Sequence, residues 1–146
     1  MADSSEGKLE PAGQPAQTPI LFWVCEYASA NPDGTFTLIR AGIDKAQAPR
    51  TPVVFSGWIF AETAPGALSS QHHQVVLSFS MNGSELLRTP AVIIASSDPR
   101  AGYGHFTIPF WVTFPEFGNA LIRLEVGDLK AEKPFSLTQS AGGSGQ

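Results

Sequence analysis

The sequence predicts an all-β protein, an antiparallel β-sandwich of seven to nine strands with Greek-key or jelly-roll connections. Segments rich in Val, Ile, Phe, Trp and Thr follow one another along the chain, and clusters of Gly, Pro, Asn, Asp and Ser separate them. No helix-like segment lies between them, and this pattern is typical of a sandwich. The expected strands are Ile20–Tyr27, Thr35–Arg40, Val53–Ala61, Gln74–Met81, Ala91–Ala95, His105–Phe114, Ala120–Val126 and Lys130–Leu137.

The chain of 146 residues reads as one domain with a polar tail at each end. Residues 1–18 are rich in Pro, Gly, Ala and Gln, and residues 138–146 read TQSAGGSGQ. Neither tail has the large apolar side chains that would offset the entropy of ordering it, so we expect both to be disordered. Residues 19–137 remain as the sandwich domain, which is long enough for a core without metals or disulfides.

The charges argue against nucleic acid and leave room for a protein partner. The formal net charge is −4, and half of this excess comes from Asp3, Glu6, Lys8 and Glu10 in the N-terminal tail. Lysines and arginines of the domain are scattered among acids, whereas nucleic-acid binding requires a basic face. Charged residues make up only 15% of the chain, against about a quarter in an average globular protein. A chain so poor in charge either buries surface against a partner or is a sandwich with a surface rich in Ser and Thr.

The compartment indicated by the sequence is the cytoplasm. The N-terminus has no basic region followed by an apolar stretch, as a signal peptide would have. No run approaches the roughly 18 apolar residues of a membrane helix. The single cysteine, Cys25, excludes an internal disulfide. We therefore expect a soluble cytoplasmic protein with no membrane partner.

The first two strands should form a hairpin through Asn31-Pro32-Asp33-Gly34, a strong turn signal. Alternation along the first strand gives it two apolar faces. Leu21, Trp23, Cys25 and Tyr27 point one way, and Phe22, Val24 and Glu26 point the other. Such a strand is either central or covered on both sides, and a second subunit could supply the cover.

The strand His105–Phe114 is the most hydrophobic, and its core face is expected to be Phe106, Ile108, Phe110, Val112 and Phe114. Pro109 cannot donate a ladder hydrogen bond, which indicates an edge strand or a bulge. Trp111 then falls on the opposite face.

Two other segments depart from regular strand patterns. Gly57, within the expected strand Val53–Ala61, indicates a bulge or a close approach of another chain segment. Ala41–Pro52 contains two prolines and is expected to be a loop or crossover.

These strands carry no catalytic motif. We therefore expect that the protein is not an enzyme and that it binds neither a metal nor a cofactor. Cys25 has no basic neighbour to lower its pKa and is expected to be a buried apolar residue. His72 and His73 are adjacent on one strand and point to opposite faces, so at most one could join His105 at a metal. There is no Gly-x-Ser-x-Gly elbow and no phosphate-binding loop.

The aromatic residues are the best candidates for a contact surface. Exposed Trp and Tyr side chains are typical of protein interfaces. The possible interface or ligand contacts are Trp23, Trp58, Tyr103 and Trp111. For Trp58 and Trp111 a place in the core remains an equal alternative.

The two ends of the domain carry a recognisable pattern. Cys25-Glu26-Tyr27-Ala28 precedes the turn Asp33-Gly34-Thr35, and the last hairpin, 121–137, turns at Gly127-Asp128 and closes with Pro-Phe-Ser-Leu. This resembles an uncharacterised family of small bacterial β-sandwich proteins, a domain of unknown function. Its members open with Cys-Asp-Tyr-Ala and an Asp-Gly-Lys turn, so Glu26 and Thr35 depart from the pattern. The resemblance implies a sandwich and a bacterial source, and no activity.

These observations favour a non-enzymatic protein-interaction or assembly module, which is either oligomeric or a subunit of a larger complex. The alternative is a sandwich that binds a carbohydrate or a small molecule through its aromatic residues. A hydrolase with a metal at His105 and either His72 or His73 ranks last, because no nucleophile, base and orienting group can be named together.

Overall fold

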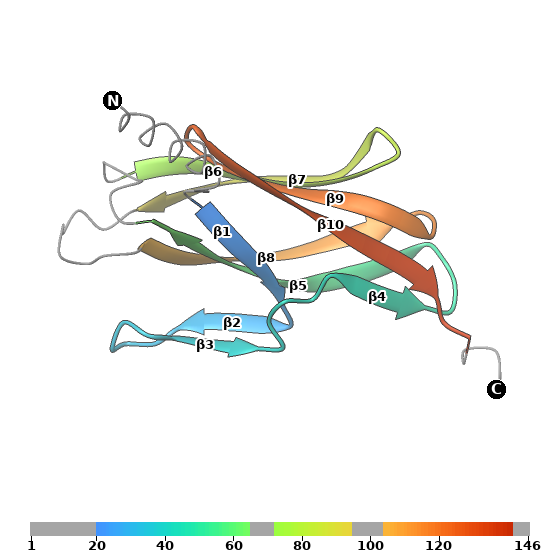
Figure 1. Ribbon diagram of the computed structural model, residues 1–146, viewed down its shortest axis with the longest axis horizontal. Helices are drawn as coiled ribbons and strands as arrows, with labels where there is room; N and C mark the ends of the chain where they lie inside the picture. The colour runs from blue at the N-terminus through green and yellow to red at the C-terminus, as the bar shows by residue number, and fades with distance from the viewer. Residues whose placement is uncertain (1–19, 65–71, 95–103, 142–146) are drawn as a thin grey trace, which may run out of the picture.

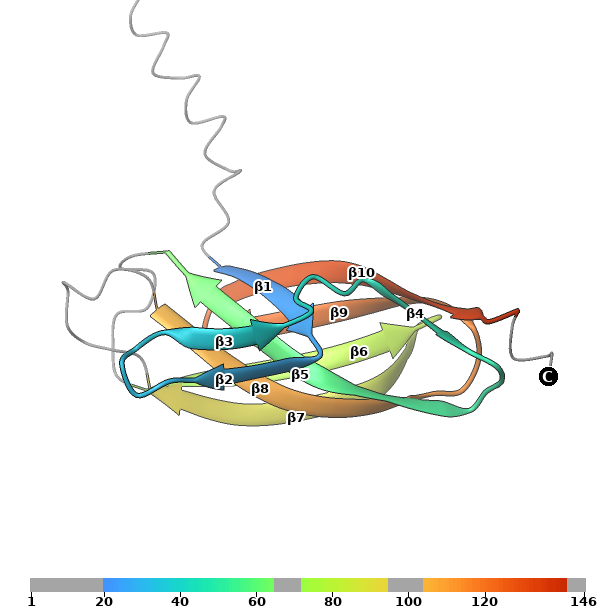
Figure 2. The ribbon, with the colours of Figure 1, turned by 90° about the horizontal axis from the view of Figure 1, so that it is seen from below.

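The computed structural model describes residues 20–64, 72–94 and 104–141, which form an all-β sandwich with no helix. Among these residues, accordingly, no helix is long and apolar enough to cross a membrane. One sheet has the order β1 (Ile20–Cys25), β5 (Val53–Thr63), β8 (Gly104–Phe114). The other has the order β4 (Lys45–Ala48), β10 (Leu129–Gln139), β9 (Gly118–Val126), β6 (His72–Met81), β7 (Ser84–Ile94). Figures 1 and 2 show these two layers face to face, with the hairpin of β2 (Tyr27–Ala30) and β3 (Phe36–Ile39) on the outer side of the smaller sheet.

The fold class is confirmed, but the described residues hold ten strands rather than seven to nine. Part of the difference comes from the expected strand Ile20–Tyr27, which is two strands. The chain turns at Glu26, whose backbone N donates to the carbonyl O of Ile39 at 2.9 Å. The predicted hairpin with its turn at Asn31–Gly34 therefore exists, but it is formed by β2 and β3 alone.

The remaining difference is β4, which lies inside the expected loop Ala41–Pro52. It pairs with the end of β10 in parallel, so the sandwich is not purely antiparallel. Its sequence, Lys-Ala-Gln-Ala, has no β-branched or aromatic residue and gives no strand signal. Backbone bonds hold it instead, and Ser136 N donates to Asp44 O at 3.1 Å beside it.

Several other strands are longer than their sequences indicate. β7 begins at Ser84 rather than Ala91, and β10 ends at Gln139 rather than Leu137. The addition to β10 is polar, whereas the addition to β7 includes Leu86 and Leu87, which pack against the core. Pairing with β4 and β6 extends these two strands. A neighbouring strand can thus impose a strand conformation on a segment with little intrinsic preference for it.

Tight turns join neighbouring strands within a sheet, and crossovers connect the two sheets. β6 and β7 are joined through Asn82-Gly83, where both residues have positive φ (52° and 82°), as a two-residue hairpin turn requires. The chain then crosses to β8 in the other sheet and returns to place β9 beside β6. This is a Greek-key connection across the two sheets.

The core lies between the sheets and follows the predicted alternation. On β8, Ile108, Phe110, Val112 and Phe114 are buried, and Phe106 is partly buried against them. From the facing sheet, β9 contributes Ile122, Leu124 and Val126, which are also buried. Phe79 and Phe135 complete an aromatic cluster with Phe110 and Phe114.

The structure also decides the two ambiguous positions. Pro109 lies on an edge strand, and the pairing of β5 with β8 continues through it without a register shift. Gly57 is a close approach: a Cβ there would lie 2.9 Å from the carbonyl O of Cys25 and 3.4 Å from the Phe110 ring. β1, in contrast, is an edge strand and not a central one.

Candidate functional site

The outer face of the three-stranded sheet collects the aromatic residues that the sequence singled out. Side chains alternate along β5, so Ser56, Trp58 and Phe60 share its outer face. The register places Trp111 of β8 opposite Ser56 and Pro109 opposite Trp58. Directly opposed residues project from the same side of a sheet, so these side chains form one surface.

One half of this face is covered by the β2–β3 hairpin. Cys25, Ala28 and Phe60 are buried there as a small second core, with Trp23 and Phe36 packed against them. The Phe60 ring lies 5.8 Å from the Trp23 ring and 5.1 Å from the Phe36 ring, measured between centroids. The chain thus supplies its own cover for the second apolar face of β1.

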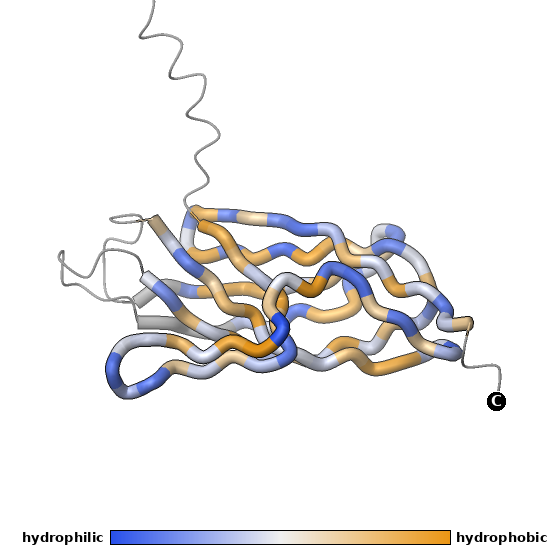
Figure 3. Tube along the Cα trace, turned by 60° about the horizontal axis from the view of Figure 1, so that its bottom comes forward, coloured by the Kyte–Doolittle hydropathy of each residue, from blue (hydrophilic) through white to orange (hydrophobic). Residues whose placement is uncertain are grey.

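The hairpin is polar at its turn, around Asn31–Gly34, and hydrophobic towards the end of β3 (Figure 3). In the turn, the amide and hydroxyl of Thr35 donate to the Asp33 carboxylate at 3.0 and 2.6 Å, and these bonds lower the pKa of Asp33. The turn is therefore solvated while the strands of the hairpin carry its apolar contacts.

The other half of the face is open, and we call it the aromatic platform: Tyr27, Val54, Trp58, Pro109 and Trp111. Trp111 is 69% exposed, Val54 60% and Tyr27 42%. The Tyr27 ring meets the half-buried Trp58 ring edge-on, with 5.6 Å between centroids. The platform is therefore continuous from the hairpin to the edge strand β8.

The four predicted contact residues divide between these surfaces. Of the two places left open for each tryptophan, Trp111 takes the exposed one, and Trp58 is intermediate because the hairpin covers part of it. Trp23 packs in the covered half, so it does not belong to the platform. Tyr103 lies outside the described residues.

Sequence reasoning missed Tyr27 and Val54 as parts of the site. The alternating pattern placed Tyr27 on the face of Trp23 and Cys25, but the turn at Glu26 moves it to the hairpin. Val54 carried a usable signal, because it lies two and four residues before Ser56 and Trp58 on one strand face.

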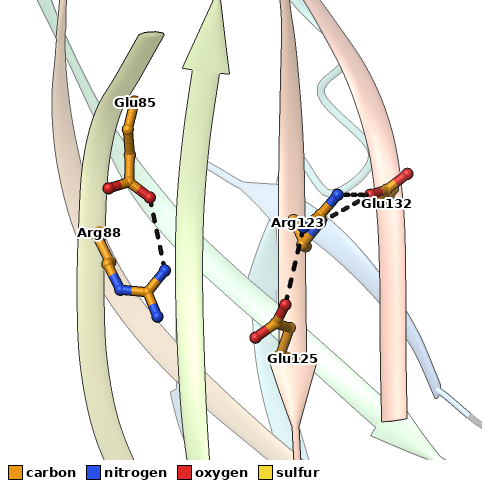
Figure 4. Close-up of polar contacts among 5 residues, drawn as sticks. All are labelled: Glu85, Arg88, Arg123, Glu125 and Glu132. Atoms are coloured by element: carbon orange, nitrogen blue, oxygen red, sulfur yellow. Dashed lines mark hydrogen bonds and ion pairs between the residues drawn. The ribbon is translucent and has the colours of Figure 1, made fainter. Parts of the chain in front are cut away.

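The outer face of the five-stranded sheet has the opposite character (Figure 4). Arg123 of β9 donates from Nε and Nη2 to Glu132 of β10 at 2.7 and 2.6 Å, and its Nη1 lies 3.9 Å from Glu125. On β7, Arg88 and Glu85 approach to 3.5 Å. This face is solvated and charged, whereas the platform contains no charged side chain.

The sequence candidates for chemistry do not assemble into a reactive site. His105 Nε2 lies 3.9 Å from the Glu62 carboxylate, and its ring stacks on Phe60 under the hairpin. His72 and His73 lie on β6 of the other sheet, and their side chains are outside the described ones. The described residues contain no group of three potential metal ligands.

Cys25 is fully buried in the second core, and its thiol donates to the carbonyl O of Trp23 at 3.8 Å. Burial raises the pKa of this thiol, the opposite of what a nucleophile requires. The residue therefore acts as a packing residue.

An open groove of about 310 Å³ lies where β1 and β10 meet, lined by Ile20, Phe22, Lys130 and Lys133 among others. Lys133 Nζ lies over the Phe22 ring, 5.7 Å from its centre, and makes a cation–π contact at this side of the sandwich. The acid in its lining, Glu132, is bound by Arg123, and the groove adds no chemistry to the platform.

No protein-family model matches the chain, and no curated protein matches it either. Among solved structures, the comparison found a β-glucosidase from Listeria innocua in complex with isofagomine, with a TM-score of 0.42 and 6% sequence identity. The match covers 82% of this chain and 16% of that enzyme. A likeness of this kind bears on neither activity nor ligand.

Proposed function

We propose that this protein is a non-enzymatic interaction module and that the aromatic platform is its contact surface. The observation that carries the proposal is Trp111, an indole side chain 69% exposed on a rigid sheet beside Trp58 and Tyr27. Tyr and Trp are enriched at the centres of protein interfaces, where they supply large contact areas.

The surroundings of the platform have the polarity of an interface rim. Ser56 and Thr113 lie next to Trp111 and Val54, and they are exposed and uncharged. Glu26 and Arg40 flank the hairpin, with their charged groups 4.0 Å apart. An apolar centre inside a polar border is the usual composition of a protein contact surface.

A carbohydrate-binding surface is the second candidate, and the flatness of the platform favours it. The rings lie on a sheet face, and the hydroxyl-bearing residues Ser56 and Thr113 lie opposite Trp111 and Val54. The C–H groups of a sugar ring can stack on such an indole face while its hydroxyls bond to the polar neighbours.

The two candidates are distinguished by comparing Trp111→Ala with Leu21→Ala. Leu21 is also half exposed, but it lies outside the platform and serves as a matched control. In cells that make the chain, chemical crosslinking should yield a defined protein complex that Trp111→Ala removes and Leu21→Ala retains. Identical crosslinks from both variants and the natural chain would overturn the proposal.

Titration with a set of oligosaccharides, followed by tryptophan fluorescence, tests the second candidate. A saturable change that Trp111→Ala abolishes would support carbohydrate binding. An unchanged spectrum across the set would count against it.

A further inference from the structure

We propose that the occupant of the aromatic platform is a second copy of this chain, in a two-fold symmetric dimer. This inference rests on the function proposed above, because it names the partner for the same surface. In a two-fold interface one patch serves both chains and must complement itself.

The hairpin shows how this sheet face accepts a cover. β2 and β3 bury Phe60 and Cys25 by packing Ala28 and Phe36 on the outer face of the sheet. The open half continues the same apolar face along β5 and β8, at Trp58, Pro109 and Trp111. One half of a single apolar surface is thus covered by the hairpin, and in the other half the side chains of Trp111 and Val54 are exposed, with no strand of residues 20–64, 72–94 or 104–141 lying over them.

The charge distribution favours a copy of the same chain over a charged partner. Residues 53–61 of β5 and 106–114 of β8 contain no Asp, Glu, Lys or Arg. A two-fold axis brings like residues opposite one another, and like charges placed so are costly. Two copies of the platform can be brought together without placing like charges opposite one another. The outer face of the five-stranded sheet, in contrast, carries charged side chains such as Arg123 and Glu132.

The area of the platform suits the centre of a dimer interface. A large aromatic side chain offers about 150–250 Å². With the exposed fractions of Trp111, Val54 and Tyr27, the platform presents roughly 400 Å² of apolar surface. A standard interface buries about 800 Å² on each partner, a little over half of it apolar. The platform and its hydroxyl-bearing rim therefore approach what a stable dimer needs.

Association through strand edges is a less favourable route. Prolines lie on β7 at Pro90, on β8 at Pro109 and on the partly unpaired β10 at Pro134. Proline cannot complete a ladder, so it discourages the addition of a strand at an edge. Strand addition is therefore disfavoured at β7, β8 and the unpaired part of β10, whereas the edge strands β1 and β4 carry no proline.

The test is the solution mass of the complete 146-residue chain, measured by light scattering over a concentration series. We expect a dimer at tens of micromolar, with a dissociation constant raised at least 30-fold by Trp111→Ala. Val54→Arg, which places two like charges across the axis, should give a monomer. Leu21→Ala should remain dimeric, and circular dichroism should show that every variant is folded.

Two results would overturn the dimer. A natural chain that stays monomeric at millimolar concentration removes the second copy as the occupant. A dimer that neither Trp111→Ala nor Val54→Arg weakens places the contact elsewhere. In either case the proposed function survives only if crosslinking in cells joins the platform to another protein through Trp111, so the two failures are distinguishable.

Discussion

Cys25 illustrates how tertiary cover decides the chemistry of a single residue. The thiol is shielded from one side by its own sheet and from the other by the hairpin. Because only the thiolate reacts readily and burial raises the pKa of this group, the folded protein should react slowly with a thiol reagent. Labelling then reports opening of the hairpin.

We predict that a disulfide reagent at pH 8 modifies Cys25 about 100-fold more slowly in the folded protein than in denaturant, because reaction requires local opening. Phe36→Ala removes the ring that rests on Phe60 and should raise the folded-state rate several-fold. Trp111→Ala, which lies in the open half, should leave the rate unchanged. Equal rates in the natural chain and Phe36→Ala would show that the hairpin does not protect the thiol.

The same pKa shift has a consequence for stability at alkaline pH. The folded state holds Cys25 in its neutral form, so its pKa is higher in the folded than in the unfolded chain. This contribution to stability is therefore present below the unfolded pKa and is lost as the pH rises through the folded one. In Cys25→Ala this part of the pH dependence of the unfolding free energy should disappear.

Gly57 is a second residue whose role depends on a neighbouring strand. We predict that Gly57→Ala lowers the free energy of unfolding by about 1–3 kcal/mol, because the new methyl group overpacks the site. The contact that must yield is the backbone O of Cys25 at 2.9 Å. Urea unfolding measures the effect, and the exposed neighbour Ser56→Ala should change stability by less than about 0.5 kcal/mol.

A tolerated Gly57→Ala, equal to the serine control, would mean that β1 moves to accept the methyl group. The sequence indicated this close approach, because glycine is unfavourable within a strand unless space requires it. It could not identify the partner atom, which belongs to a strand more than thirty residues earlier.

The exposure of the tryptophans was predictable to different degrees. For Trp111, strand alternation gives the outer face, because Phe110 and Val112 on either side of it are core residues. The partial burial of Trp58 could not be predicted in this way, since it depends on the hairpin folding back over β5. Local patterns assign a face to a residue, but they do not show what covers that face.

At the scale of elements, the free half of β10 shows how the sandwich protects an edge. β4 pairs with β10 only from Ser136 onward. The backbone N–H of Ser136 points towards β4 and donates to Asp44 O. Backbone N–H groups two residues apart in a strand point to the same edge, so an N–H at position 134 would also point to this edge, where β4 no longer pairs with β10. Pro134 has no N–H and therefore leaves no unpaired donor there. Lys133 points to the inner side, beside Phe22, and a strand added there would bury its charge.

We predict that the double substitution Lys133→Val with Pro134→Val increases aggregation, because it converts a protected edge into an apolar strand with a free N–H. Light scattering during incubation at 37 °C should show faster growth than for the natural chain. Lys130→Val, one of the exposed positions on the same strand, is the control. If the double variant stays as clear as the control, the edge is protected by something other than these residues.

The hairpins were the elements that the sequence predicted best. Asn31–Gly34 carries residues that adopt turn conformations at little cost, and the turn is present. Asn82-Gly83, at the β6–β7 turn, has the same kind of residues. β4 could not be predicted, because parallel pairing with β10 alone makes it a strand. Elements that depend on local residue chemistry could be predicted from the sequence. The strand β4, which depends on pairing with a segment far along the chain, could not.

At the scale of the whole molecule, the two outer faces explain the low charge content of 15%. The five-stranded sheet carries its charges in linked pairs around Arg123 and Arg88. The three-stranded sheet places aromatic rings and hydroxyls on the corresponding face. A sandwich with one solvated and one apolar outer face is expected to present the second to a partner.

This division predicts how self-association depends on salt. Burial of an uncharged surface is not screened by ions, so the dissociation constant should change by less than about threefold between 50 and 500 mM NaCl. Sodium sulfate should strengthen the dimer, because it strengthens the burial of apolar surface. Sedimentation velocity over a concentration series measures both effects.

Arg123→Ala provides the matched comparison on the charged face. The substitution removes the pairs with Glu132 and Glu125 and leaves the platform untouched. Its dimer should therefore have the dissociation constant of the natural chain and the same flat response to NaCl. A dissociation constant that rises steeply with salt, and that Arg123→Ala also raises, would instead place the contact on the five-stranded sheet, because Arg123 and its partners Glu132 and Glu125 lie on that face.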